Sequence, residues 1–168
     1  MASSLSWTLF DTALFGVAVG MRTLFQIAEG GDDTHTKAYT NMRGAGSLPT
    51  EESLLVQNIG VMLDHNSLVA DREGVFLHSY LELRVSDETK LLAPLRLFAT
   101  HSGSAGVYTQ AAAADEEMIG PLGDGYELGN PILIPAGNSF KVEIYQGTVM
   151  GAADQWVKIL LNGILTRT

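Results

Sequence analysis

Histidine and acidic side chains are the residues most able to bind a metal ion, and the chain has four histidines: His35, His65, His78 and His101. The usual enzymatic site on a jelly roll, that of the cupins, places two histidines one residue apart, then a glutamate, then a third histidine. No segment has that spacing, and no histidine has a second ligand two or four residues away on a convincing common face. We therefore predict no metal centre and no cofactor.

Three acidic clusters could supply calcium ligands or a catalytic pair of carboxylates: EGGDD at 29–33, EE at 51–52 and DEE at 115–117. None has the fixed oxygen spacing around a glycine that a calcium loop needs, so we interpret them as solvated loops. Glycoside hydrolysis needs two carboxylates that face each other across a cleft. A pair of carboxylates that face each other in this way stays possible, because residue spacing in one sequence does not show which side chains meet in the fold.

Glycine-rich segments give no sign of phosphate binding or acyl transfer. GSAG at 103–106 and GDGYELG at 123–129 lack the lysine of a phosphate-binding loop. HSGSAG at 101–106 lacks the G-x-S-x-G spacing of a nucleophile elbow. These segments are typical of turns, and the sequence predicts a protein that is not an enzyme.

The composition instead indicates a surface that is partly covered. Charged residues make up 17% of the 168 residues and hydrophobic residues 46%, whereas an ordinary soluble domain has about 25% charged residues. Burial of part of the surface in a protein assembly would explain this shortage of charged residues, and an apolar ligand pocket is the alternative. The net charge of −9 argues against direct binding to nucleic acid or anionic lipid. The absence of cysteine excludes disulfides and thiolate metal sites.

The elements that would position these residues are predicted to be β-strands, because apolar and polar residues alternate. Alternation runs through 5–9, 54–63, 81–85, 140–144 and 156–167. The second of these runs has on one parity the residues Leu55, Ile59, Val61 and Leu63. The last run also fits one face of a helix, but Gly163 inside it favours a strand.

Turn signals separate these runs, and they lie at 29–33, 43–49, 101–106, 120–125, 129–131 and 135–138. Short helices are predicted at 65–73 and 110–118. Eight or so strands in a single domain, 1–168, predict an all-β fold: a two-sheet antiparallel sandwich, a single jelly roll, with one or two short helices. The longest apolar run, 13–21, has about half of the ~20 residues that a bilayer-crossing helix needs, so we predict no span.

The first twenty residues allow two interpretations. In the simpler one, 1–20 forms the first one or two strands of the sandwich. In the other, part of 1–20 is an N-terminal arm that reaches a neighbouring subunit as an exchanged or added strand, since an open strand edge pairs readily. The candidate assembly interface consists of the apolar residues of this segment: Leu5, Trp7, Leu9, Phe10 and Phe15.

Three segments carry a resemblance to a known family. They are TNMRGAGSLP at 40–49, within 23–63, then IPAGNSFKVEI at 134–144 and WVKILLNGILTR at 156–167. In the same order, they resemble segments of the single-jelly-roll major capsid proteins of tailless icosahedral viruses with an inner membrane, those of Thermus phages in particular. Two departures are the Ser53-Leu54-Leu55 run, where the family pattern has an aromatic residue, and 65–130, which has no counterpart.

The resemblance implies a structural virion protein, a major capsid subunit that builds an icosahedral shell by self-association, at least to a dimer. It implies synthesis in the host cytoplasm, a place in the virion shell, a second and larger capsid protein as companion, and proximity to an inner viral membrane. A chain without cysteine also fits a shell that survives heat, as in a thermophilic host. A carbohydrate-binding or receptor-binding β-sandwich module is the main alternative, and a cupin-related protein that has lost its metal ligands is a third.

Overall fold

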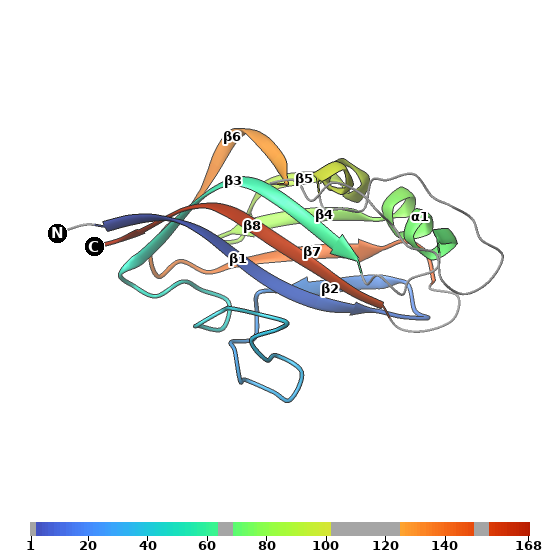
Figure 1. The fold of residues 1–168 in the computed structure, drawn as a ribbon, viewed down its shortest axis with the longest axis horizontal. Helices are drawn as coiled ribbons and strands as arrows, with labels where there is room; N and C mark the ends of the chain where they lie inside the picture. The colour runs from blue at the N-terminus through green and yellow to red at the C-terminus, as the bar shows by residue number, and fades with distance from the viewer. Residues whose placement is uncertain (1–2, 64–68, 102–124, 150–154) are drawn as a thin grey trace.

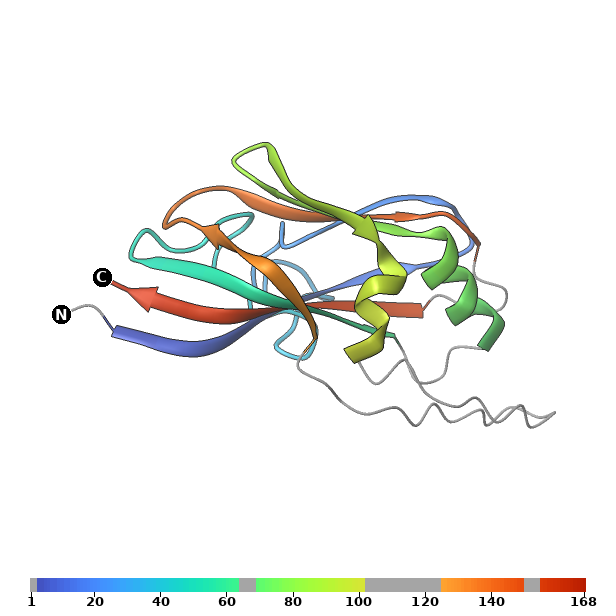
Figure 2. The same cartoon turned by 90° about the horizontal axis from the view of Figure 1, so that it is seen from above.

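A computed structural model describes residues 3–63, 69–101, 125–149 and 155–168. In this part of the chain, strands form two antiparallel sheets of four strands each that face each other as two layers (Figures 1 and 2). The strands are β1 (Ser3–Phe15), β2 (Gly20–Leu24), β3 (Glu52–Leu63), β4 (Tyr80–Val85), β5 (Glu88–Pro94), β6 (Tyr126–Ile134), β7 (Phe140–Gln146) and β8 (Gln155–Arg167). The helices are α1 (Val69–His78) and the 3-10 helix η1 (Leu95–His101).

The order of the strands is that of a jelly roll. One sheet has the order β1-β8-β3-β6 and the other β2-β7-β4-β5. The first strand pairs with the last, the second with the second last, the third with the sixth and the fourth with the fifth, all antiparallel. A chain that doubles back on itself and is then rolled up gives this order. The all-β sandwich and the single jelly roll predicted from the sequence are therefore confirmed.

The core lies between the sheets and takes one parity of residues from each strand. In β8, Val157, Ile159 and Leu161 point inward and are fully buried, so the last run is a strand and not a helix. The alternation predicted for β4 and β7 is confirmed by their buried residues, which are Leu81, Leu83, Val85, Phe140, Val142 and Ile144. Because side chains alternate along a strand, the opposite parity of each strand faces outward.

The predicted parity of β3 is wrong at its beginning. The register between β3 and β8 shifts at Gln57, which is the extra residue of a β-bulge on β3. The register with β6 is also irregular there, but the extra residues lie on β6. Leu54 and Val56 are buried before the bulge, and Ile59 is buried after it. Leu55, which shares the parity of Ile59 in the sequence, therefore faces outward and is half-buried. One extra residue reverses the face, and alternation alone does not reveal it.

Gly163 lies opposite this bulge, paired with Val56. A β-carbon built on Gly163 would lie 1.9 Å from the carbonyl oxygen of Leu55. Any side chain would collide with the backbone of β3 there, so the close approach of β3 and β8 at the bulge depends on glycine.

The connections gather at the two ends of the sandwich. α1 and η1 lie together at one end (Figure 2). α1 overlaps the described part of the helix predicted at 65–73 and continues beyond it to His78. η1 was not predicted. At the other end, Ser86 and Asp87 join β4 to β5 with φ values of 50° and 63°, which fits a two-residue hairpin turn. Within the described residues, neither helix is long and apolar enough to cross a membrane.

Two groups of predicted elements receive no test. The helix predicted at 110–118 lies outside the described residues, as do nearly all of the turns predicted at 101–106 and 120–125. The apolar run 13–21 is divided between the end of β1, a short connection and the beginning of β2.

Candidate interaction surfaces

The two histidines whose side chains the structure describes lie in different parts of the fold, His35 in the connection from β2 to β3 and His78 at the end of α1. In the parts of the chain that the structure describes, no three His, Asp or Glu residues could hold a metal ion together. His35 Nδ1 lies 2.7 Å from Asp32 Oδ1 in the connection from β2 to β3, which we call the β2–β3 loop (25–51). Hydrogen bonds from His35 and then Thr34 hold the pKa of Asp32 well below its usual value. His65 and the side chain of His101 lie outside the described part.

The acidic pair at 51–52 is not simply a solvated loop. Glu52 begins β3 and is only 5% exposed. Its Oε1 accepts hydrogen bonds from Arg43 Nη1 and Arg167 Nε, both at 2.8 Å. The interpretation of this cluster as solvent-exposed is therefore wrong for Glu52, because the fold brings Arg167, 115 residues away, and the nearby Arg43 onto one carboxylate. The three residues tie the β2–β3 loop and the end of β8 to the beginning of β3.

A buried carboxylate fixes the start of the β2–β3 loop. Asp11 projects inward from β1 and is 1% exposed. Its Oδ2 accepts a hydrogen bond from the backbone N–H of Phe25, a residue with a φ of 65° in the left-handed region. Its Oδ1 is buried without a hydrogen-bond partner among the described residues. Burial raises the pKa of Asp11, and the hydrogen bond from Phe25 is the largest effect opposing that rise.

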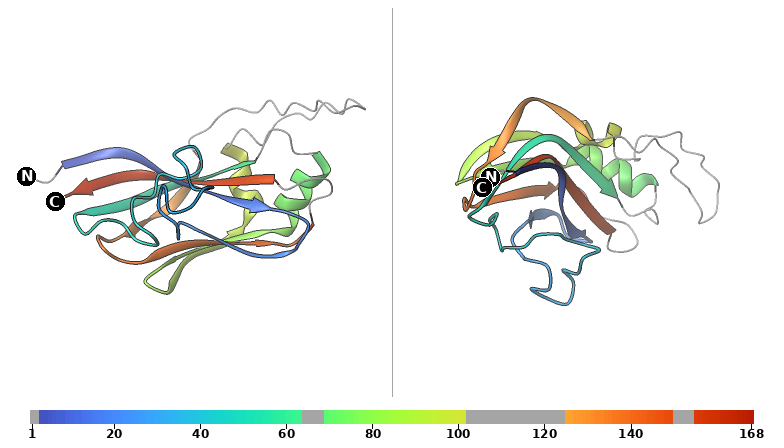
Figure 3. Two further views of the ribbon diagram at one scale, coloured as in Figure 1. Left: turned by 90° about the horizontal axis from the view of Figure 1, so that it is seen from below. Right: turned by 60° about the vertical axis from the view of Figure 1, so that its left-hand side comes forward.

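The β2–β3 loop closes part of the open edge of β1. Asn41 Oδ1 accepts the backbone N–H of Phe10, and Asn41 Nδ2 donates to the carbonyl oxygen of Thr8, each at 2.8 Å. The backbone N–H of Asn41 donates to the carbonyl oxygen of Phe10 at 3.2 Å. Nearby, Thr12 Oγ1 donates to the carbonyl oxygen of Tyr39 at 2.7 Å. The loop thus takes the place of a neighbouring strand along the middle of β1 (Figure 3).

The outer side of the sheet β1-β8-β3-β6 carries very few charges. We call the outward residues of its first three strands the low-charge face. They are Ser4, Ser6, Thr8, Phe10, Thr12, Leu14, Trp156, Lys158, Leu160, Asn162, Ile164, Thr166, Ser53, Leu55, Asn58, Gly60 and Met62. Lys158 alone among them is charged. Its Nζ donates to the carbonyl oxygen of Ala38 at 2.7 Å and lies 5.0 Å from the centre of the Phe10 ring.

Three apolar residues form a row on the outer side of this sheet: Ile164 of β8 and Leu55 of β3, both on the low-charge face, and Leu133 of β6. The register continues the row to Ser6 of β1. Ile164 is 37% exposed and Leu133 52% exposed. At the far end of the face, the β2–β3 loop covers Trp156, whose ring centre lies 4.7 Å from that of Tyr39. The uncovered part therefore lies toward the ends of the strands where both termini emerge (Figure 1).

The outer side of the second sheet has one apolar row and, beside it, a region of paired charges. An apolar row crosses it at Met21, Tyr145, Tyr80 and Pro94. The tyrosine rings stack 5.3 Å apart at an interplanar angle of 16°. Farther along the strands, acidic and basic residues alternate and neutralise each other; for instance, Lys141 Nζ lies 2.8 Å from Glu143 Oε1.

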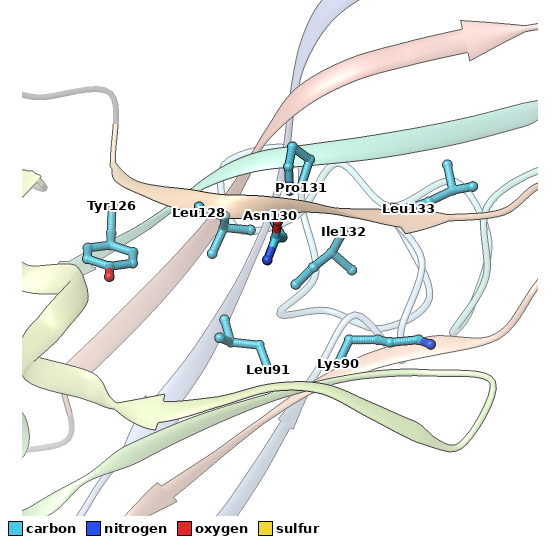
Figure 4. A pocket seen from close by; sticks show the side chains of 9 residues that line it. Lys90, Leu91, Tyr126, Leu128, Asn130, Pro131, Ile132 and Leu133 are labelled. Atoms are coloured by element: carbon cyan, nitrogen blue, oxygen red, sulfur yellow. The ribbon is translucent and has the colours of Figure 1, made fainter.

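A groove of about 510 Å³ separates the edge strands β5 and β6. Leu91 of β5 faces Leu128 and Ile132 of β6 across the groove, with Lys90 at one end (Figure 4). Lys90 Nζ is paired with Glu88 Oε2 at 2.6 Å, so its charge is already compensated. Among the described residues, this groove is one position where the apolar ligand pocket left open by the composition would fit.

The five residues predicted as an assembly interface fall into two groups. Leu9 and Phe15 lie in the core, 4% and 0% exposed, and so contribute no surface of the single chain. Leu5 and Trp7 point to the inner side but are half-buried, and Phe10 is half-buried on the low-charge face. β1 pairs with β8 of its own chain over its full length. Whether 1–20 is exchanged between subunits stays a prediction.

Sequence reasoning missed the residues that dominate the low-charge face. Ile164, Leu55 and Leu133 come from three different strands, and their row exists only through the pairing register. A partial signal was present, because the outward parity of β8 has Leu160, Asn162 and Ile164 in succession without a charge.

No protein-family model matches the chain, and searches among curated proteins and solved structures find no match either.

Proposed function

We propose that the chain is a structural, non-enzymatic subunit of a viral shell that assembles by packing against copies of itself. The low-charge face carries this proposal. A chain with a net charge of −9 repels its own copies wherever its charges meet, so copies pack at least cost through a surface without charge. The fold supports the proposal but does not carry it, because the jelly roll hosts many unrelated functions.

The size of this face would supply a large part of a stable contact. Strands rise about 3.3 Å per residue and lie about 4.8 Å apart. A face with the length of β8 and the width of three strands therefore covers on the order of 600 Å², and the β2–β3 loop covers its end at Trp156. A standard protein–protein interface buries about 800 Å² per partner. A neighbouring copy on this face would account for the shortage of charged residues in the composition.

A matched pair of variants tests the proposal. Ile164→Asp places a charge in the apolar row of the low-charge face, whereas Thr23→Asp places the same charge at an exposed position on the outer side of the second sheet. The mass of each protein in solution is followed by sedimentation over a range of concentrations. We expect the wild type and Thr23→Asp to associate, and Ile164→Asp to associate at least about tenfold more weakly. A wild type that stays monomeric at every concentration would rule the function out.

The proposed function also includes a larger companion capsid protein and a position over an inner viral membrane, both of which come from the family resemblance. Co-purification from infected cells or virions, with mass spectrometry of the partner, tests the companion.

A carbohydrate-binding module is the second candidate, and the stacked pair Tyr80 and Tyr145 favours it. Each ring is 36% exposed, and amphipathic aromatic rings of this kind suit a ligand with both apolar and polar faces. Binding to a glycan array that Tyr80→Ala abolishes, by a protein that stays monomeric, would favour this function over the first.

A further inference from the structure

The two sheets have four edge strands, β1 and β6 in one and β2 and β5 in the other. An edge strand presents unpaired backbone N–H and C=O groups, and soluble proteins protect such edges with prolines, charges, bulges or covering loops. The edges of this chain differ sharply in how far they are protected.

Three edges carry recognisable protection. β6 leaves its regular pairing with β3 between Glu127 and Ile132. Pro131 lies in that stretch and has no backbone N–H to donate. β5 carries Glu88 and Lys90 and ends at Pro94.

β2 is short, and Arg22 fills the space between β2 and β1. The Arg22 Nε donates to the carbonyl oxygen of Leu14 at 3.1 Å, and Nη2 donates to that of Ala18 at 2.8 Å.

The edge of β1 is protected over only part of its length. Asn41 bonds the outward backbone groups of Thr8 and Phe10, which shows that the even-numbered residues of β1 turn their N–H and C=O away from β8. Ser4 and Ser6 have the same parity. On that open side, no described residue forms a hydrogen bond with the backbone of either serine. The stretch Ser3–Trp7 also contains no charge, proline or glycine.

We propose that this open edge, Ser3–Trp7, pairs with the same edge of a second copy, antiparallel, about a two-fold axis. The proposal deepens the proposed function by naming the contact that forms its first dimer. A register centred on Leu5 sets Ser4 of one copy opposite Ser6 of the other. Each such pair exchanges two backbone hydrogen bonds. The two sheets then join into one continuous sheet, and their low-charge faces become a single surface.

A second copy fits this edge better than a strand of another protein for two reasons. A strand that meets itself about a two-fold axis is antiparallel by symmetry, so the contact closes at a dimer. The absence of charge also favours it. Ser3–Trp7 contains no charged residue, and beside it Arg43 and Arg167 both bond the carboxylate of Glu52. In a chain with a net charge of −9, two copies that meet at this stretch place no charged side chains of the strand opposite each other.

Proline at the edge provides the test. Ser6→Pro removes an outward N–H without touching a bond to β8, and proline is tolerated on an edge strand when its nitrogen faces solvent. Ser6→Ala is the matched control, because it changes the same side chain and keeps the N–H. Both full-length variants and the wild type are compared by sedimentation at several concentrations, with thermal unfolding as the check of folding.

We expect Ser6→Pro to weaken the dimer at least about tenfold and Ser6→Ala to leave it unchanged. Dimers that persist unaltered in Ser6→Pro would overturn the edge contact while leaving self-association intact, whereas a monomeric wild type would overturn the proposed function itself. A wild type that stays monomeric but binds a strand of another protein would overturn the second copy as the occupant.

Hydrogen exchange on the wild type decides the matter if Ser6→Pro does not fold. The amides of Ser4 and Ser6 should exchange at least about tenfold more slowly in concentrated than in dilute protein, because pairing protects them. The amides of β4, inside the second sheet, serve as the internal reference. Equal exchange of these two amides at both concentrations would overturn the edge contact.

Discussion

At the scale of single residues, Asp11 is the most unusual side chain that the structure describes. It is a nearly fully buried carboxylate with one oxygen bonded to the Phe25 N–H and the other without a partner. Desolvation is the main cause of its raised pKa. The fold keeps this costly group because its bonded oxygen anchors the chain where β2 turns into the β2–β3 loop.

Asp11→Asn should therefore change how stability depends on pH. Because the pKa of Asp11 is higher in the folded state than its ordinary value of 3.8, the folded state binds the proton more tightly than the unfolded state does. The contribution of Asp11 is most favourable when it is protonated, and is lost as pH rises through the folded pKa. Urea unfolding across the range from acidic to neutral pH should show the stability of wild type falling, relative to Asp11→Asn, as pH increases. A difference between the two proteins that does not vary with pH would contradict this.

Gly163 is the second residue whose identity the packing demands. Gly163→Ala would set a β-carbon against the Leu55 carbonyl oxygen, and the backbone of two paired strands gives way only at a cost. Overpacking of this kind typically costs 1–3 kcal/mol, so we expect the free energy of unfolding to fall by about 3 kcal/mol in chemical denaturation. Gly129→Ala on β6 is the control, because nothing lies within 4 Å of its β-carbon position.

At the scale of elements, the β2–β3 loop works as a cover for the β1 edge rather than as a loose connection. Its contacts with β1 run through Asn41 and Thr40, and Glu52 and Asp11 secure its two ends. A loop held at both ends and in the middle closes one part of an edge and leaves another part open. This explains why pairing with another copy is expected at 3–7 and not along the whole of β1.

Asn41→Ala should destabilise the fold and extend the open edge. Two side-chain hydrogen bonds disappear, and each is worth about 1 kcal/mol net, so we expect about 2 kcal/mol less stability by denaturant unfolding. Larger aggregates should also form, measured by light scattering, because the newly exposed edge is a template for further strands. Asn41→Asp keeps the acceptor for the Phe10 N–H and should lose less stability. An Asn41→Ala protein that is as stable and soluble as wild type would show that the loop does not protect the edge.

At the scale of the whole molecule, the uneven distribution of charge over the surface affects self-association more than the net charge does. The net charge of −9 opposes the association of copies, while the low-charge face and the edge at 3–7 offer contacts that need no ion pairs. Association should therefore depend on ionic strength in a direction opposite to that of a contact held by salt bridges.

Added salt should strengthen self-association. Raising the salt concentration to about 0.1 M shortens the screening length to about 10 Å, which weakens the repulsion between copies and leaves the uncharged contacts unaffected. We expect the dissociation constant, measured by sedimentation, to fall several-fold between low salt and about 0.3 M salt. A dissociation constant that rises with salt would instead indicate an interface held by ion pairs.

The sequence by itself determined the class of fold. Alternation in the runs at 81–85, 140–144 and 156–167 fixes which residues face the core, because the two faces of a strand differ by one residue regardless of what packs against them. Turn residues between these runs then leave a two-sheet sandwich as the natural arrangement of the strands. The composition also indicated that part of the surface is covered, although not which part.

Tertiary structure alone decided where the surfaces lie. Gln57 forms a bulge only in the pairing of β3 with β8, and that single residue turns Leu55 outward into line with Ile164 and Leu133. Glu52 is buried where Arg167, 115 residues away in the chain, reaches it together with the nearby Arg43. The pairing register and the meeting of side chains from different segments depend on which strands are neighbours. Alternation within one strand contains no information about its neighbours.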